Sequence, residues 1–144
     1  MQATNMERHR KVKTFHDLVV WQKAHALVLD VYRLTESFPD KERFGIVAQL
    51  RRSAASIPAN IVEGYGRRTT KEWLQSLAIA NGSLEETRYF LLLSHDLRYL
   101  KQEDQAGLNQ QCDSVAELMA GLARSLRNRV GEVRGARSTG NGAR

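Results

Sequence analysis

Disulfide-forming, chain-breaking and aromatic residues are all scarce in this sequence. Its 144 residues include one cysteine and two prolines, and aromatic side chains make up 7%. A single thiol, Cys112, cannot form an internal disulfide, which excludes a small disulfide-stapled domain. The longest apolar run, residues 89–93, is far below the roughly 20 residues that a membrane-spanning helix needs. Because the N-terminus also lacks the apolar segment of a secretion signal, we expect a cytoplasmic protein that does not enter a membrane.

Motifs for catalysis and for metal or cofactor binding are missing too. The chain has no phosphate-binding loop, no Gly-x-Gly-x-x-Gly and no cysteines with metal-ligand spacing. None of its four histidines follows an acidic residue by three positions, as the di-iron sites of helical bundles require. His25 and His95 each stand alone on an expected helix, and Cys112 falls within an apolar stripe. We therefore predict no catalytic residue, no metal and no cofactor.

The hydrophobic pattern is helical throughout residues 16–130. No stretch alternates with a period of two, whereas apolar side chains recur every three or four positions in four stretches. The main members of the four stripes are Val20, Ala24, Leu27 and Val31; Val47, Leu50, Ala54, Ile57 and Ile61; Leu77, Ala80, Leu84 and Leu91; and Leu108, Cys112, Val115, Met119 and Leu126. We predict an all-α fold, in which four helices joined by short loops form an antiparallel up-and-down bundle.

Local signals mark the ends of the first two helices. Asp17 is a candidate N-cap for a first helix over about residues 17–36. Pro58 falls inside the second stripe, where it removes a backbone donor and predicts a kink. The glycines of the segment 64–66 are expected to end this second helix by the usual C-terminal glycine conformation.

The last two helices carry similar signals. Thr69 and Glu72 form a capping box at the start of a third helix that is expected to run to about residue 97. Gly131 is expected to end the fourth helix. The predicted organisation is therefore a basic flexible segment over residues 1–15, the bundle over 16–130 and a disordered Gly/Arg tail over 131–144.

Positive charge is distributed unevenly along the chain. Lys and Arg number 22 against 16 Asp and Glu, a formal net charge of +6. Residues 1–15 and 131–144 contribute +3 and +2, which leaves the predicted bundle close to neutral. Within it, residues 41–71 carry seven positive and two negative side chains, whereas residues 72–117 carry three and eight. The net charge permits a polyanionic partner without requiring one.

Five cations of the basic segment bracket the second helix. They are Arg51, Arg52, Arg67, Arg68 and Lys71. The two arginine pairs are 16 residues apart, about 24 Å along an ideal helix, so they mark its two ends. Two interpretations are open: contact with nucleic-acid phosphates, independent of base sequence, or ion pairing with the acidic segment that follows. Oligomerisation could gather copies of either pair into a ring of positive charge.

A polar stripe runs beside the apolar stripe of the second helix. It consists of Gln49, Ser53, Ser56, Asn60 and Glu63, at spacings of four, three, four and three. Small hydroxyl side chains let another helix approach closely, and the amides can form hydrogen bonds across such a contact. Because buried polar groups need partners, we interpret the stripe as a helix–helix or subunit contact; the alternative is a solvated face.

Four parts of the sequence resemble one bacterial family. They are FHDLVVWQKA at residues 15–24, a sparser set formed by Tyr32, Phe38-Pro39 and ERFG at 42–45, QLRRSAASIPANIVEGYGR at 49–67 and IANGSLEE at 79–86. The chain resembles the four-helix-bundle family encoded by intervening sequences within 23S rRNA genes, and it is similar to the accessory protein of diversity-generating retroelements. It departs from the family at Val62, where alanine is common, and at residues 86–90.

The resemblance implies an up-and-down bundle that assembles as a homopentamer and has no known enzymatic activity. In the retroelement branch it implies binding to nucleic acid and to a reverse transcriptase. We therefore predict a non-enzymatic homo-oligomer, with a pentamer favoured, that binds RNA or DNA through backbone phosphates at the five cations. The polar stripe is the predicted oligomer interface. The alternative is an oligomeric scaffold or adaptor for a protein partner, with charges that serve only solubility and assembly.

Overall fold

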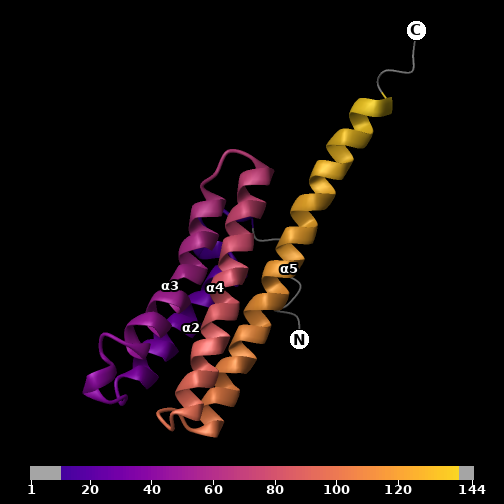
Figure 1. The fold of residues 1–144 in the computed structure, drawn as a ribbon. Coiled ribbons are helices and arrows are strands. Elements are labelled where there is room, and N and C mark those ends of the chain that lie inside the picture. The colour runs from indigo at the N-terminus through magenta and orange to yellow at the C-terminus, as the bar shows by residue number, and fades with distance from the viewer. Residues whose placement is uncertain (1–10, 140–144) are drawn as a thin grey trace, which may run out of the picture.

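The computed structural model describes the backbone of residues 11–139 and, apart from residues 132–134 and 136–139, their side chains. Two short 3-10 turns and four α-helices follow one another in this part of the chain, which contains no strand. The elements are η1 (Phe15–Asp17), α2 (Val19–Thr35), η2 (Asp40–Glu42), α3 (Ile46–Tyr65), α4 (Thr70–Asp96) and α5 (Gln102–Thr139). The helices run alternately up and down (Figure 1), which confirms the predicted all-α four-helix bundle.

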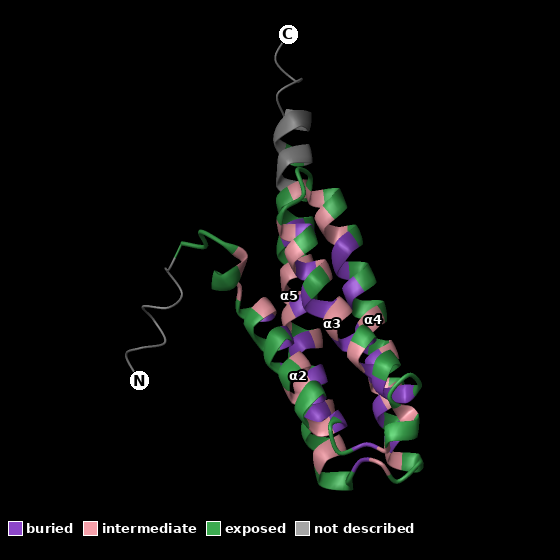
Figure 2. Ribbon diagram, turned by 90° about the vertical axis from the view of Figure 1, so that its left-hand side faces the viewer, coloured by how far each residue is buried: buried purple, intermediate pink, exposed green. Residues whose placement is uncertain are grey.

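The core lies where the four predicted apolar stripes meet (Figure 2). All five stripe residues of α3 are buried, and the most exposed of them, Val47, retains only 7% of its surface. α3 packs most extensively against α4, and α2 and α5 complete the bundle. Burial of these side chains is the main stabilising contribution, at about 25 cal/mol per Å² of apolar surface. Within residues 11–139, the helices contain no stretch long and apolar enough to span a bilayer.

The start of α2 differs from the prediction. α2 begins at Val19, and its N-cap is Leu18, which supplies no side-chain hydrogen bond. Asp17 directly precedes this N-cap as the last residue of η1, and its Oδ2 accepts hydrogen bonds from the backbone amides of Lys13 (3.0 Å) and Thr14 (3.1 Å). Asp17 was therefore wrongly predicted as the cap of α2, because its carboxylate closes the preceding 3-10 turn instead.

Aromatic rings fix η1 on the first turns of α2. Phe15 and Trp21 meet edge-on with ring centroids 5.0 Å apart, and Trp21 stacks on His25 at the same centroid distance. The side-chain amide of Gln22 donates a hydrogen bond to the carbonyl of His16 over 2.8 Å. These contacts hold the chain that enters α2 against the first turns of that helix.

α3 ends at the predicted glycines, but by a different mechanism. Gly66 has a right-handed conformation with φ −80°, and its N–H donates to the carbonyl of Val62 over 3.1 Å. The glycine that the structure requires is Gly64, which is buried against α4. A Cβ atom at Gly64 would lie 2.3 Å from Cδ1 of Trp73. Close helix contact, rather than a left-handed glycine, therefore accounts for this position.

The remaining helix signals had mixed outcomes. The N–H of Glu72 donates to Oγ1 of Thr69 over 3.1 Å, which confirms Thr69 as the N-cap of α4. α3 continues through Pro58, which lies within it. Gly131 was wrongly predicted to end the fourth helix, because α5 continues to Thr139; glycine inside a helix costs only about 1 kcal/mol. Residues 131–139 of the predicted disordered tail belong to α5, so the prediction is wrong for that part. Residues 1–10 and 140–144, which belong to the predicted flexible ends, lie outside the described residues.

Candidate nucleic-acid interface

The turn between α3 and α4 is anchored by both helices. Gly64 of α3 lies directly against Trp73 of α4, and the rings of Tyr65 and Trp73 meet edge-on with centroids 5.9 Å apart. Thr69 then caps the first turn of α4. Side chains on this turn are therefore presented from a fixed backbone at one end of the bundle (Figure 1).

Three of the five predicted phosphate-binding cations lie at this turn. Arg67 forms an ion pair with Glu63 of the preceding helical turn. Arg68 and Lys71 are exposed, and within the described part of the chain neither has a hydrogen bond or an ion pair. Because exposed ion pairs are weak, Arg67 remains available to bind an anion. Arg68 and Lys71 can bind one without first losing a contact within the described part of the protein.

The other two predicted cations are used within the subunit. Arg51 donates from Nε to Oγ1 of Thr35 over 2.9 Å, and its guanidinium lies 4.4 Å from the ring centroid of Tyr32. Arg52 pairs with Glu86 on α4, which is the ion pairing with the acidic segment that the sequence left open. The structure therefore does not bring the two arginine pairs together, and it leaves the α3–α4 turn as the more accessible cationic site.

Antiparallel packing gathers positive charge at the end of the bundle that carries this turn. We call residues 11–25, 58–80 and 117–131 the basic end, since their helices meet there. The basic end has nine Lys and Arg against four Asp and Glu. The other half of the same region, residues 26–57 and 81–116, has eight against ten. One end of the molecule is therefore net positive and the other net negative.

The contribution of α5 to the basic end is not visible in the linear sequence. Arg124, Arg127 and Arg129 are all exposed on α5, more than 50 residues beyond the turn. They come near the start of α4 because α5 runs antiparallel to it, so that Leu74 and Ala123 border the same groove. The antiparallel topology predicted from the sequence, combined with the helix lengths, is sufficient to place these arginines near the start of α4.

The centre of the polar stripe is used between α3 and α4 of one chain. Ser53 is completely buried, and its hydroxyl oxygen accepts a hydrogen bond from Oγ1 of Thr87 over 3.0 Å. Oγ of Ser56 accepts from Oγ of Ser83 over 2.8 Å, and the amide of Asn60 donates to the Ser56 carbonyl over 2.7 Å. These residues therefore form a contact between two helices of one subunit, which is one of the contacts predicted for the stripe.

The two ends of the polar stripe face solvent. Gln49 accepts a hydrogen bond from Nε of Arg52 over 3.1 Å, and Glu63 pairs with Arg67. Ser53 has no surface left for a second chain, whereas the other four stripe residues are at least partly exposed. A subunit contact on this side would therefore involve the rim of the stripe and not its centre.

The isolated histidines and the cysteine do not form a reactive cluster. His25 stacks on Trp21, and Nδ1 of His95 lies 3.5 Å from Asp96. Cys112 is completely buried, and burial raises the pKa of its thiol to about 11. Among the described residues, no three His, Cys, Asp or Glu side chains are grouped so that they could hold a metal ion.

Comparisons with known proteins agree with the bundle. A protein of unknown function from the S23 ribosomal protein family of Bacteroides thetaiotaomicron has a similar solved structure, with a TM-score of 0.69. The match covers 74% of this chain and 96% of that chain at 24% identity, so it supports the fold alone. Among curated proteins no match is found. The family described as 23S rRNA-intervening sequence protein matches residues 16–121. The chain is therefore a member of the 23S rRNA-intervening sequence protein family.

Proposed function

We propose that this chain is a non-enzymatic, homo-oligomeric bundle that binds RNA or DNA through backbone phosphates at its basic end. The observation that carries the proposal is the α3–α4 turn, where Arg68 and Lys71 are exposed and without partners in the described structure. A guanidinium can donate two parallel hydrogen bonds to one phosphate, and an ammonium adds a compact charge. Such contacts are independent of base sequence and weaken with salt.

Exposed apolar side chains on α4 support assembly into an oligomer, expected to be a pentamer. Ile79 and Tyr89 are 58% and 57% exposed, and Leu92 and Leu97 are close to half exposed. Contact between subunits would remove this apolar surface from water. Each added subunit would also bring another copy of the basic turn, and several linked weak sites bind a long polyanion far more tightly than one site does.

Gel-shift measurements on the full chain test the phosphate contacts. The probes are a single-stranded RNA and a duplex DNA of about 30 nucleotides, in salt from about 50 to 200 mM. The double variant Arg68→Ala/Lys71→Ala should weaken binding to both probes and lower the dependence of log K on log salt by about one for each cation removed. The matched control is Lys41→Ala/Lys101→Ala, which removes two exposed lysines from the opposite half and should leave both quantities unchanged.

Two results would contradict the proposal. One is absence of any shift at low salt with the unmodified protein. The other is equal loss of affinity in the two double variants, since binding would then follow total charge and not the basic turn.

A further inference from the structure

α4 and α5 diverge toward the basic end (Figure 1), and the groove between them is lined mostly by apolar side chains. The groove has a volume of about 390 Å³ and is lined by residues of these two helices. Leu74, Leu77 and Asn81 line it on α4, and Met119 and Ala123 line it on α5. This volume falls within the range of about 300–1,000 Å³ that is typical of binding pockets.

The shape of the groove suits a third helix. Its floor is formed by Leu77 and Met119, which are 4% and 3% exposed, and its walls include Ala78, Ala120 and Ala123. Such small side chains let another helix backbone approach closely. The lining positions advance by three or four residues along both walls, which produces the ridges and grooves by which helices pack on one another.

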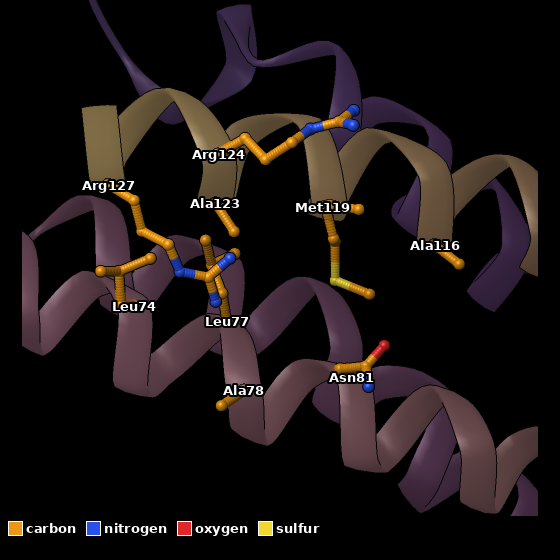
Figure 3. Close-up of a pocket in the computed structure, with 10 residues that line it drawn as sticks. Leu74, Leu77, Ala78, Asn81, Ala116, Met119, Ala123, Arg124 and Arg127 are labelled. Atoms are coloured by element: carbon orange, nitrogen blue, oxygen red, sulfur yellow. The ribbon is translucent and has the colours of Figure 1, made fainter. Parts of the chain in front are cut away.

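The charge around the groove has one sign. Arg124 and Arg127 line it, no carboxylate does, and neither arginine has an ion pair or hydrogen bond within the described residues. Figure 3 shows Arg127 reaching across the groove toward Leu77, while Arg124 extends away from α4. The Arg127 guanidinium can therefore reach a carboxylate of an occupant that fills the apolar floor, and Arg124 adds positive charge on α5 beside the groove.

We propose that this groove binds an amphipathic helix of a partner protein, with apolar side chains on the floor and an acidic side chain beside Arg127. Apolar anchors at helical spacing are the usual means of helix-in-groove recognition, and the opposite charges select acidic over basic helices. A second copy of the chain is a poorer occupant, because the part of α5 that extends beyond the other helices (Figure 1) is basic, with three arginines and one glutamate in residues 128–139. The site is independent of the phosphate contacts at the α3–α4 turn.

Fluorescence anisotropy with model peptides and the full chain tests the site. The probe is a labelled peptide of about 18 residues, with leucines at helical spacing and glutamates flanking them; a second peptide carries lysines in place of the glutamates. The glutamate peptide should bind at least ten times more tightly than the lysine peptide. Arg127→Glu should reverse this preference, which simple loss of folding could not do.

Filling the groove provides the matched pair of variants. Ala123→Trp places a large ring between α4 and α5 and should abolish peptide binding, whereas Ala106→Trp, at an exposed position elsewhere on α5, should not. Arg68→Ala/Lys71→Ala should leave peptide binding unchanged, which separates this site from the proposed nucleic-acid contacts.

Three outcomes would overturn the inference. Equal binding of the two peptides, or unchanged binding to Ala123→Trp, would show that the groove and its charge do not select the ligand. A lower oligomer mass for Ala123→Trp would assign the groove to a second copy of this chain. Displacement of the peptide by the RNA probe, together with loss of RNA binding in Ala123→Trp, would assign it to nucleic acid.

Discussion

At the scale of single residues, Gly64 is constrained by space more than by backbone conformation. Its missing Cβ is what allows Trp73 to lie against α3, and Cδ1 of that ring would be 2.3 Å from an added methyl group. Trp73 is also held by Tyr65, so the ring cannot simply move aside. We expect Gly64→Ala to lower the free energy of unfolding by about 1–3 kcal/mol, as measured by urea denaturation.

Gly107→Ala is the matched control for this prediction. Gly107 lies inside α5, and a Cβ there would meet nothing within 4 Å. Replacement should stabilise the protein by up to about 1 kcal/mol, because alanine is the better helix former. If both substitutions stabilise the protein, Trp73 has room to move and the proposed constraint at Gly64 is wrong.

Because Cys112 is buried, we predict that the protein loses stability as pH rises above 9. Burial raises the pKa of its thiol from an ordinary 9.0 to about 11, although nearby Arg88 opposes this effect. Above pH 9 the unfolded chain loses the thiol proton and the folded chain keeps it, so rising pH favours unfolding until the folded thiol ionises. Between about pH 9 and 10.5, this linkage should cost roughly 1.5 kcal/mol of folding stability.

The thiol contribution can be isolated with Cys112→Ala. Urea unfolding of both proteins at several pH values gives the difference in their stability, in which titrations common to both cancel. The free energy of unfolding of the variant should increase relative to that of the unmodified protein as pH rises from 9 to 10.5. Below pH 8 the difference between the two proteins should not change with pH. A difference that stays constant over the whole range would mean that the folded thiol titrates normally.

At the scale of helices, the end of α4 carries backbone strain. Arg98 has φ 65°, a left-handed conformation that costs a residue with a Cβ about 1 kcal/mol or more. It is held there by a closing motif in which Arg98 N–H donates to the His95 carbonyl and Tyr99 N–H to the Ser94 carbonyl, both over 2.9 Å. Glycine is the usual residue at this position.

Arg98→Gly should therefore stabilise the protein by about 1 kcal/mol, seen as a higher urea midpoint with an unchanged slope. Gln75→Gly is the control, because Gln75 is exposed inside the same helix and glycine there should cost about 1 kcal/mol. Destabilisation by both changes would show that the Arg98 side chain contributes more than its conformation costs.

The sequence predicts a helix end correctly where the capping contact involves only neighbouring residues and can form at only one place. Thr69 and Glu72 are three residues apart, and their capping contact needs no other part of the chain. Asp17 shows the limit of such signals, since the same carboxylate can cap either of two consecutive turns and local sequence does not decide between them. The length of α5 was missed because Gly131 weakens a helix without ending it.

The candidate site was harder to predict, because its properties depend on contacts between distant residues. Arg51 and Arg68 each belong to a pair of consecutive arginines in the sequence. Of the two, only Arg51 contacts a neighbouring helix, through Thr35 and Tyr32. The polar stripe was recognised as a contact, but its partner residues on α4, Ser83 and Thr87, could not be identified from spacing alone. Pairing across helices is set by register, which apolar periodicity constrains only loosely.

At the scale of the whole molecule, the antiparallel topology redistributes the charged segments of the chain between the two ends of the bundle. A small net charge therefore conceals a bundle with one positive and one negative end. This arrangement permits a polyanion to approach from one end while subunits meet along their sides, since the exposed apolar residues of α4 are spread along that helix, from Ile79 to Leu92. Assembly and phosphate binding can then be disrupted separately.

Ile79 is the position at which the proposed assembly is most open to test. The hydrogen bond between Ser56 and Ser83 sets the register of α3 against α4, so that Ile79, one turn before Ser83, lies level with the partly exposed Asn60. Ile79→Arg should lower the mass measured by light scattering to that of smaller species without reducing helix content, because a charge buried between subunits is costly. Leu29→Arg is a matched control on α2, since Leu29 is 57% exposed and Ile79 58%. An unmodified protein that is already monomeric, or equal dissociation of both variants, would contradict a subunit contact at this face.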